Sequence, residues 1–353
     1  MKKFHFSRGV FYRFRLSVII SVLFVGVQIV ALQHFYFLNN VASANEIDTP
    51  YLQKLKLERE QVHEQSARLL FMGDTMLARS IGTSIVNGIN PYEFVLEQLN
   101  SHDLRIANIE TTVADESFVS AATKPYTFNA PLSSLQILKN VHIDLSSLAN
   151  NHTGDFGRLA TKNMLEQFES NELLTVGAGT SISDAFKPVF IEHDGIRLAF
   201  IAVNDIELVH TKVSDSQVGS AFLDKDLIAS SIQSAKQAGA DAVFVLPHWG
   251  VEYSTTQSKR QVEWGRFMID AGATAVIGGH PHVVQPTEEY NGGYIVYSLG
   301  NFIFDGMEGE ALRGQMISLE IQKSTNYKST TTKVKSLQSV GTLIDNNGFP
   351  RLM

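Results

Sequence analysis

Apolar residues beyond residue 66 fall into short runs that alternate with amphipathic stretches. Runs with the length of strands lie at residues 69–72, 104–107, 144–148, 173–176, 242–246 and 275–277. Stretches with helical spacing lie at residues 94–99, 135–141, 159–168, 227–237 and 262–271. This alternation is typical of a layered α/β domain.

Other patterns indicate additional β structure. The dipeptide Asp194-Gly195 separates two apolar runs and is a strong hairpin signal. Farther along, residues 294–298 and 316–321 predict strands, and the Ser/Thr/Lys-rich segment 324–335 predicts a loop or an exposed hairpin. About 240 residues of mixed β and βα pattern fit one domain with a two-sheet core.

The first 44 residues have the features of a targeting segment. Five basic residues precede an uncharged apolar run of 17 residues, 16–32, which the following aromatic residues extend to a length that can span a bilayer. The basic flank should stay in the cytoplasm, so the rest of the chain should lie on the extracytoplasmic side. Ala42-Ser43-Ala44 also fits a signal-peptidase site, and cleavage near Ala44 with secretion or periplasmic release is the alternative. The long apolar run favours an uncleaved, single-pass anchor in the cell membrane.

Composition and charge narrow the class of protein. The chain of 353 residues has 44% apolar and 18% charged residues, as expected for a globular protein whose core needs no covalent staple. It has no cysteine, which excludes disulfides, thiolate metal sites and cysteine nucleophiles. Residues 1–44 contribute +5 to a net charge of −7, so residues 45–353 carry −12. Such an acidic domain argues against nucleic acid as a partner.

These patterns divide the chain into four segments. Residues 1–44 form a cytoplasmic tip with a membrane anchor or signal peptide, and the polar residues 45–65 form a linker. Residues 66–310 form the α/β domain. Residues 311–353 form a C-terminal β extension.

Polar clusters follow five of the predicted strands. They are Gly73-Asp74, Asn108-Ile109-Glu110, Asn150-Asn151-His152, Pro247-His248-Trp249-Gly250 and Gly278-Gly279-His280-Pro281-His282. In open α/β sheets, ligands bind beyond the carboxyl ends of the strands. Asp, Glu, Asn and His side chains are ligands for divalent metals such as Mn, Fe or Zn. Each cluster alone more often marks a turn, cap or loop, but five in order at strand ends predict a metal site.

The ordered motifs resemble those of the CapA-type family of poly-γ-glutamate capsule biosynthesis proteins, within the calcineurin-like metallophosphatase superfamily. The resemblance covers residues 67–305. Besides the clusters above it includes Lys124-Pro125-Tyr126-Thr127-Phe128, Asp155-Phe156-Gly157 and Tyr297-Ser298-Leu299-Gly300-Asn301-Phe302. It implies an α/β fold with a four-layer α/β/β/α sandwich, here preceded by an N-terminal transmembrane helix.

Carried over by position, the resemblance implies two divalent metal ions. It assigns Asp74 and His282 to one ion, Asn151, His248 and His280 to a second, and Glu110 to the bridging position. His152 would correspond to the general acid or transition-state stabiliser of the superfamily. In such a site one ion holds and activates a water while both stabilise developing charge, and a neighbouring imidazole can protonate the leaving group.

Two positions depart from the superfamily pattern. Many metallophosphatases have Asp-x-His at the first strand, whereas this chain has Asp74-Thr75-Met76, and a thioether is a poor ligand for hard metals. Asn108-Ile109-Glu110 replaces the usual Gly-Asp bridging motif. The first metal ion would therefore be weakly held, differently coordinated or absent.

Three further residues are candidates for binding an anionic substrate group. Arg79 and Lys124 offer cations and Tyr126 offers a phenol, which suit carboxylate or phosphate. The alternative for each is a solvated surface side chain.

Two functions follow. The predicted ligands favour a metal-dependent hydrolase or transferase that acts outside the cell on an anionic polymer or ester during capsule synthesis. The resemblance, the predicted anchor and Met76 favour instead a non-catalytic, membrane-anchored subunit that works with a polymer synthase or export complex.

Overall fold

The computed structural model describes residues 62–118, 121–206 and 211–353. Val62–Met353 forms one compact unit. The anchor predicted at residues 16–32, the cleavage site near Ala44 and nearly all of the linker 45–65 lie outside the described residues. In the described ranges, no helix is both long enough and apolar enough to cross a bilayer.

The first sheet is built around the long strand β1. Among the described residues the sheet has eight strands in the order β18-β17-β16-β1-β2-β5-β6, and β15 pairs with β1 off this path. Their bounds are β1 (His63–Thr75), β2 (Leu104–Ile109), β5 (Leu145–Ser147), β6 (Thr175–Val176), β15 (Asn301–Ile303), β16 (Arg313–Thr325), β17 (Thr330–Ile344) and β18 (Pro350–Leu352). Strands β1, β2, β5 and β6 run parallel, while β16 pairs antiparallel to β1.

The second sheet also has a parallel centre. In the described part of the chain it has six strands in the order β13-β14-β12-β11-β9-β8. Their bounds are β8 (Val189–His193), β9 (Ile196–Asn204), β11 (Ala242–His248), β12 (Ala275–Ile277), β13 (Thr287–Tyr290) and β14 (Gly293–Val296). Strands β9, β11, β12 and β14 are parallel, and β8 and β13 join antiparallel. Two small ribbons pair β3 (Thr112–Val113) with β4 (Asn129–Ala130), and β7 (Ala178–Gly179) with β10 (Gly219–Ser220).

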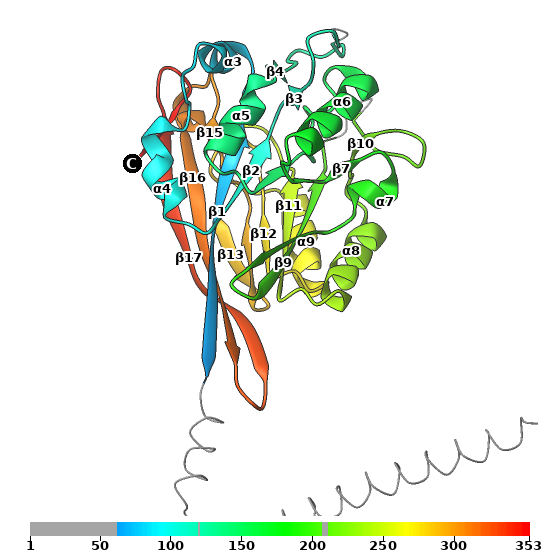
Figure 1. The fold of residues 1–353 in the computed structure, drawn as a ribbon, viewed down its shortest axis with the longest axis vertical. Coiled ribbons are helices and arrows are strands. Elements are labelled where there is room, and N and C mark those ends of the chain that lie inside the picture. The colour runs from blue at the N-terminus through cyan, green and yellow to red at the C-terminus, as the bar shows by residue number, and fades with distance from the viewer. Residues whose placement is uncertain (1–61, 119–120, 207–210) are drawn as a thin grey trace, which may run out of the picture. The chain divides into compact units, whose positions relative to one another are not determined.

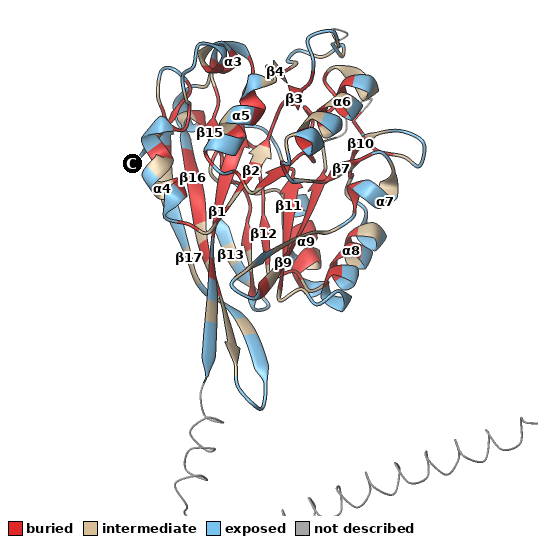
Figure 2. Cartoon of the chain, viewed as in Figure 1, coloured by how far each residue is buried: buried red, intermediate tan, exposed pale blue. Residues whose placement is uncertain are grey.

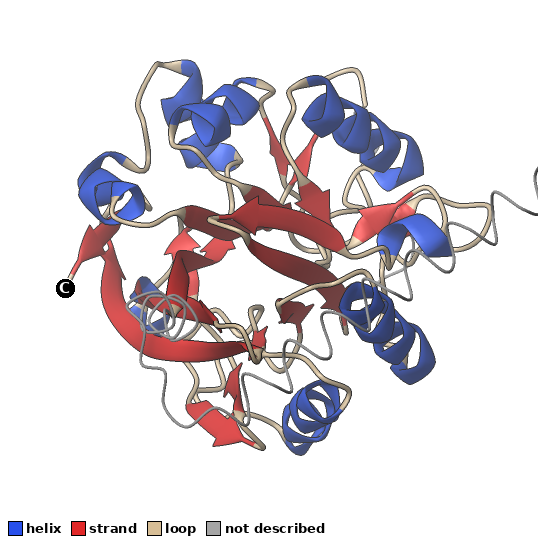
Figure 3. Cartoon of the chain, turned by 60° about the horizontal axis from the view of Figure 1, so that its bottom comes forward, coloured by secondary structure: helices blue, strands red, loops and turns tan. Residues whose placement is uncertain are grey.

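Helices cover the outer face of each sheet, so the layers run helix, sheet, sheet, helix (Figures 1 and 3). The α-helices are α3 (Arg79–Val86), α4 (Leu96–Asn100), α5 (Ser133–Asn140), α6 (Gly157–Ser170), α7 (Ile182–Ala185), α8 (Lys225–Gln237) and α9 (Lys259–Asp270). Short 3-10 turns lie at Glu93–Val95 and Gly309–Leu312. The implied α/β/β/α arrangement is therefore present.

Alternation along the strands explains why the core has separate layers. Successive side chains of a strand point to opposite faces of the sheet. In β1, Leu69 and Phe71 face the second sheet, where the ring of Phe71 lies 5.4 Å from that of Phe244. Leu70 and Met72 face the other way and join the core under α3, α5 and α6. A third apolar cluster packs the second sheet against α8 and α9.

Several local predictions can be compared with the structure. The hairpin at Asp194-Gly195 is confirmed as β8–β9, and the segment 324–335 is confirmed as an exposed hairpin between β16 and β17 (Figure 2). Strand β1 starts at His63, inside the stretch expected as linker, because its first residues pair with the end of β16. The segment 311–353 supplies β16, β17 and β18 to the first sheet, with β16 directly beside β1.

Candidate metal centre

The predicted ligands converge where the two sheets present the carboxyl ends of their parallel strands. Asp74 lies at the end of β1, Glu110 directly follows β2, and His248 ends β11. The segment after β12 reaches across both sheets, because the backbone N–H of His280 donates to Asp74 Oδ2 at 3.0 Å. Parallel strands that end at one edge bring such side chains together, and the site straddles the two sheets.

Glu110 lies at the centre of this cluster. Its side chain is fully buried, and neither carboxylate oxygen has a hydrogen-bond partner within the described part of the chain. Oε1 lies 3.5 Å from Nε2 of His248, 3.8 Å from Nε2 of His282 and 3.9 Å from Nε2 of His152. Burial raises the pKa of the Glu110 carboxyl well above its usual range, and Asp74 adds to this shift. A buried, unpaired carboxylate is costly, and a bound cation would remove that cost.

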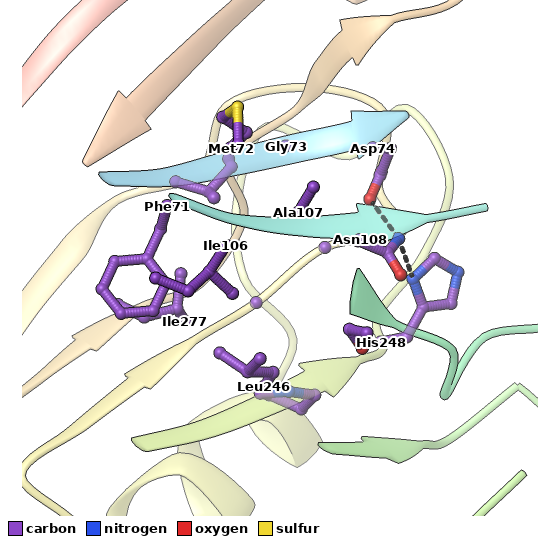
Figure 4. A pocket seen from close by; sticks show the side chains of 15 residues that line it. Phe71, Met72, Gly73, Asp74, Ile106, Ala107, Asn108, Leu246, His248 and Ile277 are labelled. Carbon is purple, nitrogen blue, oxygen red and sulfur yellow. Dashed lines mark hydrogen bonds between the residues drawn. The ribbon is translucent and has the colours of Figure 1, made fainter. Parts of the chain in front are cut away.

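Asn108 links ligands that come from different sheets (Figure 4). Its Nδ2 donates to Asp74 Oδ1 at 2.9 Å and lies 3.3 Å from His248 Nδ1, while its Oδ1 accepts from Asn150 at 3.1 Å. Below this link a small cavity of about 30 Å³ separates the apolar side chains of the two sheets. The sequence places Asn108 in one of the polar clusters without predicting it as a ligand, although its position two residues before Glu110 puts both side chains on the same side of an extended strand.

The segment 279–282 has an unusual backbone. His280 and His282 have φ values of 95° and 58°, in the left-handed region that bulky residues rarely adopt. Such backbone strain is typically stored at functional sites. Gly279 lets the backbone of this segment approach the Asp74 carboxylate closely, because a Cβ at position 279 would lie 2.5 Å from Asp74 Oδ1.

The histidine side chains are held in a state suited to metal binding. His282 Nδ1 shares a 2.8 Å hydrogen bond with Asn301 Oδ1, which leaves Nε2 facing Glu110. A side-chain oxygen bonded to the second ring nitrogen is the usual way in which a ligating histidine is oriented. Burial lowers the pKa of His248 to about 4 and that of His280 well below its usual range. The imidazoles of His248 and His280 are therefore neutral, as metal binding requires.

The donor set fits divalent cations. Among the described residues, two groups each offer three ligand atoms within 4.8 Å of one another, and Glu110 belongs to both: Glu110, His280 and His282, and Asp74, Glu110 and His248. Asn151 joins the second group, because its Oδ1 lies 2.7 Å from His248 Nε2. His280 Nδ1 is buried without a partner in the described ranges. All six predicted ligands thus meet in one place, while their division between two ions stays a prediction.

Met76 takes no part in the cluster. Its side chain is fully buried in the apolar core between the first sheet and its helices, and its sulfur accepts a 3.1 Å hydrogen bond from the N–H of Ala78. The position that carries a histidine in many metallophosphatases is therefore part of the hydrophobic core in this chain.

His152 points its Nε2 toward the cluster. Asp155 Oδ2 lies 2.7 Å from Nδ1, and the ring stacks on Phe128 with centroids 4.2 Å apart. Burial lowers the pKa of His152 to about 4, against the opposing effect of Asp155. A neutral imidazole with Nδ1–H bonded to a carboxylate exposes Nε2 for proton exchange.

The three predicted substrate residues have different surroundings. Arg79 forms an ion pair with Asp305, and its guanidinium lies 5.0 Å from the ring centroid of Phe128. The ammonium of Lys124 forms an ion pair with Asp155. Tyr126 is two-thirds exposed. Their predicted contacts with a substrate stay predictions.

An exposed aromatic side chain on another loop lies near the histidines. Tyr253 has a φ of 62°, its N–H donates to Pro281 O at 2.8 Å, and its ring lies 6.1 Å from that of His282. The left-handed backbone of a large, exposed residue is the structural signal that singles it out.

The chain is similar to known proteins over most of its length. Residues 68–306 match the family model described as bacterial capsule synthesis protein PGA_cap. The chain is 32% identical over 286 residues to the PGA biosynthesis protein CapA of Bacillus subtilis (strain 168), an alignment covering 80% of this chain and 72% of the relative. It is 31% identical over 268 residues to the capsule biosynthesis protein CapA of Bacillus anthracis, covering 73% of this chain and 65% of that relative, so less than two thirds of its length.

A solved structure has a similar fold. The calcineurin-like phosphoesterase YfkN of Bacillus subtilis aligns with a TM-score of 0.52, covering 82% of this chain and 94% of the other. Sequence identity is 14%, so the likeness concerns the fold alone.

Proposed function

Because this chain belongs to the bacterial capsule synthesis protein family PGA_cap, we propose that it takes part in making a capsule or poly-γ-glutamate polymer. Its role in that process is that of a metal-dependent hydrolase or transferase, held at the extracytoplasmic face of the cell membrane by residues 1–44. One observation carries the enzymatic part of the proposal. The fully buried Glu110 carboxylate faces three imidazoles and lacks a hydrogen-bond partner in the described part of the chain.

The metal ligands and the proton donor have separate tasks in this proposal. Asp74, Glu110, Asn151, His248, His280 and His282 would hold two divalent cations. When bound, such cations would supply Lewis-acid polarisation of the scissile group and lower the pKa of a bound water. His152 presents Nε2 to the same space while Asp155 holds Nδ1, so Nε2 can take up a proton from the attacking water and the resulting imidazolium can pass it to the leaving group.

The substrate is proposed to be an anionic polymer or an ester. The predicted ions would attract an anion to an otherwise acidic domain. Tyr126 and Tyr253 are largely exposed, and phenol side chains suit hydrogen bonding and stacking with such a substrate. Subunits of a polymer synthase or exporter are the proposed protein partners.

Metal content and hydrolysis test the proposal together. The full-length chain, stripped with EDTA and reloaded with Mn, Fe or Zn, should bind close to two ions and hydrolyse bis(4-nitrophenyl) phosphate or poly-γ-glutamate. His280→Ala should lose at least one ion and most of the activity, because it removes a buried ligand. His63→Ala, at an exposed histidine of β1, is the control. Full metal loading with no turnover of any substrate would reject the enzymatic role.

One observation favours the second candidate function, a non-catalytic subunit of a polymer synthesis or export complex. Met76 is part of the apolar core where many metallophosphatases have a ligand. If this function holds, a strain that carries His152→Ala should make capsule at the wild-type level, whereas deletion of residues 1–44 should abolish capsule. Loss of capsule in the His152→Ala strain, with the protein still present in the membrane, would support the enzyme instead.

A further inference from the structure

Residues 122–128 wrap around a single buried carboxylate. The N–H of Ala122 donates to the backbone oxygen of Asp155 at 2.6 Å, and the N–H of Phe128 donates to Asp155 Oδ2 at 2.7 Å. Between these two bonds, the ammonium of Lys124 pairs with Asp155 Oδ1. Asp155 has no exposed side-chain surface. The carboxylate therefore joins this loop to the loop that carries His152.

The charged end of Lys124 is buried inside the protein rather than exposed to solvent. Its side chain is only 11% exposed, its Nζ donates to the backbone oxygen of Asn151 at 3.0 Å, and Nζ lies 3.3 Å from His152 Nδ1. The ammonium is therefore compensated by two oxygen atoms, Asp155 Oδ1 and Asn151 O, and little of the side chain reaches solvent. A buried carboxylate is stable as an anion only when a cation and hydrogen bonds compensate it, and Lys124 is the cation for Asp155.

The same carboxylate sets the orientation of His152. Asp155 Oδ2 accepts the hydrogen bond from Nδ1 at 2.7 Å, and the stacked ring of Phe128 blocks rotation of the imidazole out of its plane. Nε2 is then unprotonated and lies 3.9 Å from Glu110 Oε1. Without this cation, the buried carboxylate would be neutralised by a proton, its O–H would donate to Nδ1, and the tautomer with hydrogen on Nε2 would gain population.

We propose that Lys124 is a positioning residue, which acts through Asp155 to fix His152 as the tautomer with hydrogen on Nδ1. This role takes the place of the substrate contact expected from the sequence. Its catalytic consequence rests on the proposed enzymatic function, while its structural part does not. The segment 122–128 thereby supports the imidazole that exchanges protons at the site, and Tyr126 lies on the exposed side of the same segment.

The tautomer can be observed without metal or substrate. In the full-length chain, labelled with ¹⁵N-histidine and kept in EDTA at neutral pH, long-range ¹H–¹⁵N spectra distinguish protonated from unprotonated ring nitrogens. His152→Gln assigns the signal. We expect wild-type His152 to have a protonated Nδ1, Lys124→Met to show a mixture of both tautomers, and Lys124→Arg to restore the wild-type signal. Lys162→Met, at an exposed lysine of α6, should change nothing.

A double-mutant cycle keeps the inference testable if Lys124→Met fails to fold. Lys124→Met combined with Asp155→Asn carries no unpaired buried charge. Since Lys124 acts through Asp155, the double variant should match Asp155→Asn alone in its His152 signal. Wild-type His152 protonated at Nε2, or a folded Lys124→Met variant with an unchanged tautomer, would overturn the inference.

Kinetics separate positioning from substrate binding. Where the chain turns over a substrate, Lys124→Met should lower kcat by about tenfold to a hundredfold, a part of what a proton donor contributes, and leave KM close to wild type. A higher KM with unchanged kcat would instead assign Lys124 to the substrate. If the chain hydrolyses no substrate but the tautomer of His152 still depends on Lys124, the proposed function is rejected and the positioning role of Lys124 is retained.

Discussion

The buried histidines make the metal-free chain sensitive to acid, and His248 allows the size of the effect to be worked out. Its side chain is almost fully buried beside Glu110 and Asn151. Burial lowers its pKa to about 4 from an ordinary value of 6.5. Because the folded pKa is the lower one, this group contributes stability above pH 6.5, and that contribution is lost as the pH falls toward 4.

The magnitude follows from proton linkage. At pH 5 the imidazole of the unfolded chain is almost fully protonated, whereas the folded one is mostly neutral. The difference lowers the free energy of unfolding by about 2 kcal/mol relative to pH 8. His152 has a similarly lowered pKa and adds a loss of the same sign.

Urea unfolding of the full-length chain in EDTA, at pH 8 and pH 5, measures this loss. His248→Gln should lose about 2 kcal/mol less than wild type between the two pH values, because the titrating group is gone. Asn151→Ala is the matched control, since it removes the 2.7 Å partner of His248 but keeps the imidazole. It should be about 1 kcal/mol less stable at pH 8 and retain the pH dependence.

If His248→Gln and wild type lose the same stability between pH 8 and pH 5, then His248 is either already protonated in the folded chain or solvated there. Its assignment as a neutral, buried ligand would then be wrong.

Three further predictions concern the site and the core. Gly279→Ala should lower the metal content measured by mass spectrometry, because its Cβ would lie 2.5 Å from Asp74 Oδ1; wild-type content would contradict the close approach. Asn301→Ala should weaken metal binding by about tenfold to a hundredfold in calorimetry, because it removes the 2.8 Å partner of His282; unchanged affinity would show that Asn301 does not orient this ligand. Phe244→Ala, fully buried between the sheets, should cost about 3–5 kcal/mol in urea unfolding, and a loss below 1 kcal/mol would mean that the sheets close over the gap.

The apolar pattern predicted the parallel centres of both sheets better than their edges. The run at residues 69–72 marks the buried middle of β1, where both faces of the strand are covered. The strand begins six residues earlier, at His63, because its first residues pair with β16 through the backbone and remain mostly exposed. Backbone pairing between segments so far apart in sequence leaves no periodic signal, so the start of β1 could not be read from the sequence.

The ligands were predictable because each stands at the end of a strand, a position with a local signature. The residues that orient these ligands could not be predicted from the sequence. Asn108 meets His248 and Asn301 meets His282 through contacts between different segments of the chain. Lys124 was identified as a cation, but its partner Asp155 is visible only in three dimensions. The membrane anchor at residues 16–32 stays a prediction.

The position of the cluster between the two sheets has a mechanical consequence. Asp74 and His280 are 206 residues apart in sequence, yet they are joined by a hydrogen bond. Ions bound between the sheets would act as cross-links between the two ends of the segment from Asp74 to His280. The entropic cost of bringing the ends of a segment together grows with its length. Because the apolar core already holds the rest of the two sheets together, the ions would restrict the separation of the sheets only at the strand ends that carry the ligands. Under the proposed function, the bound ions would therefore also hold together the strand ends of the two sheets that carry their ligands.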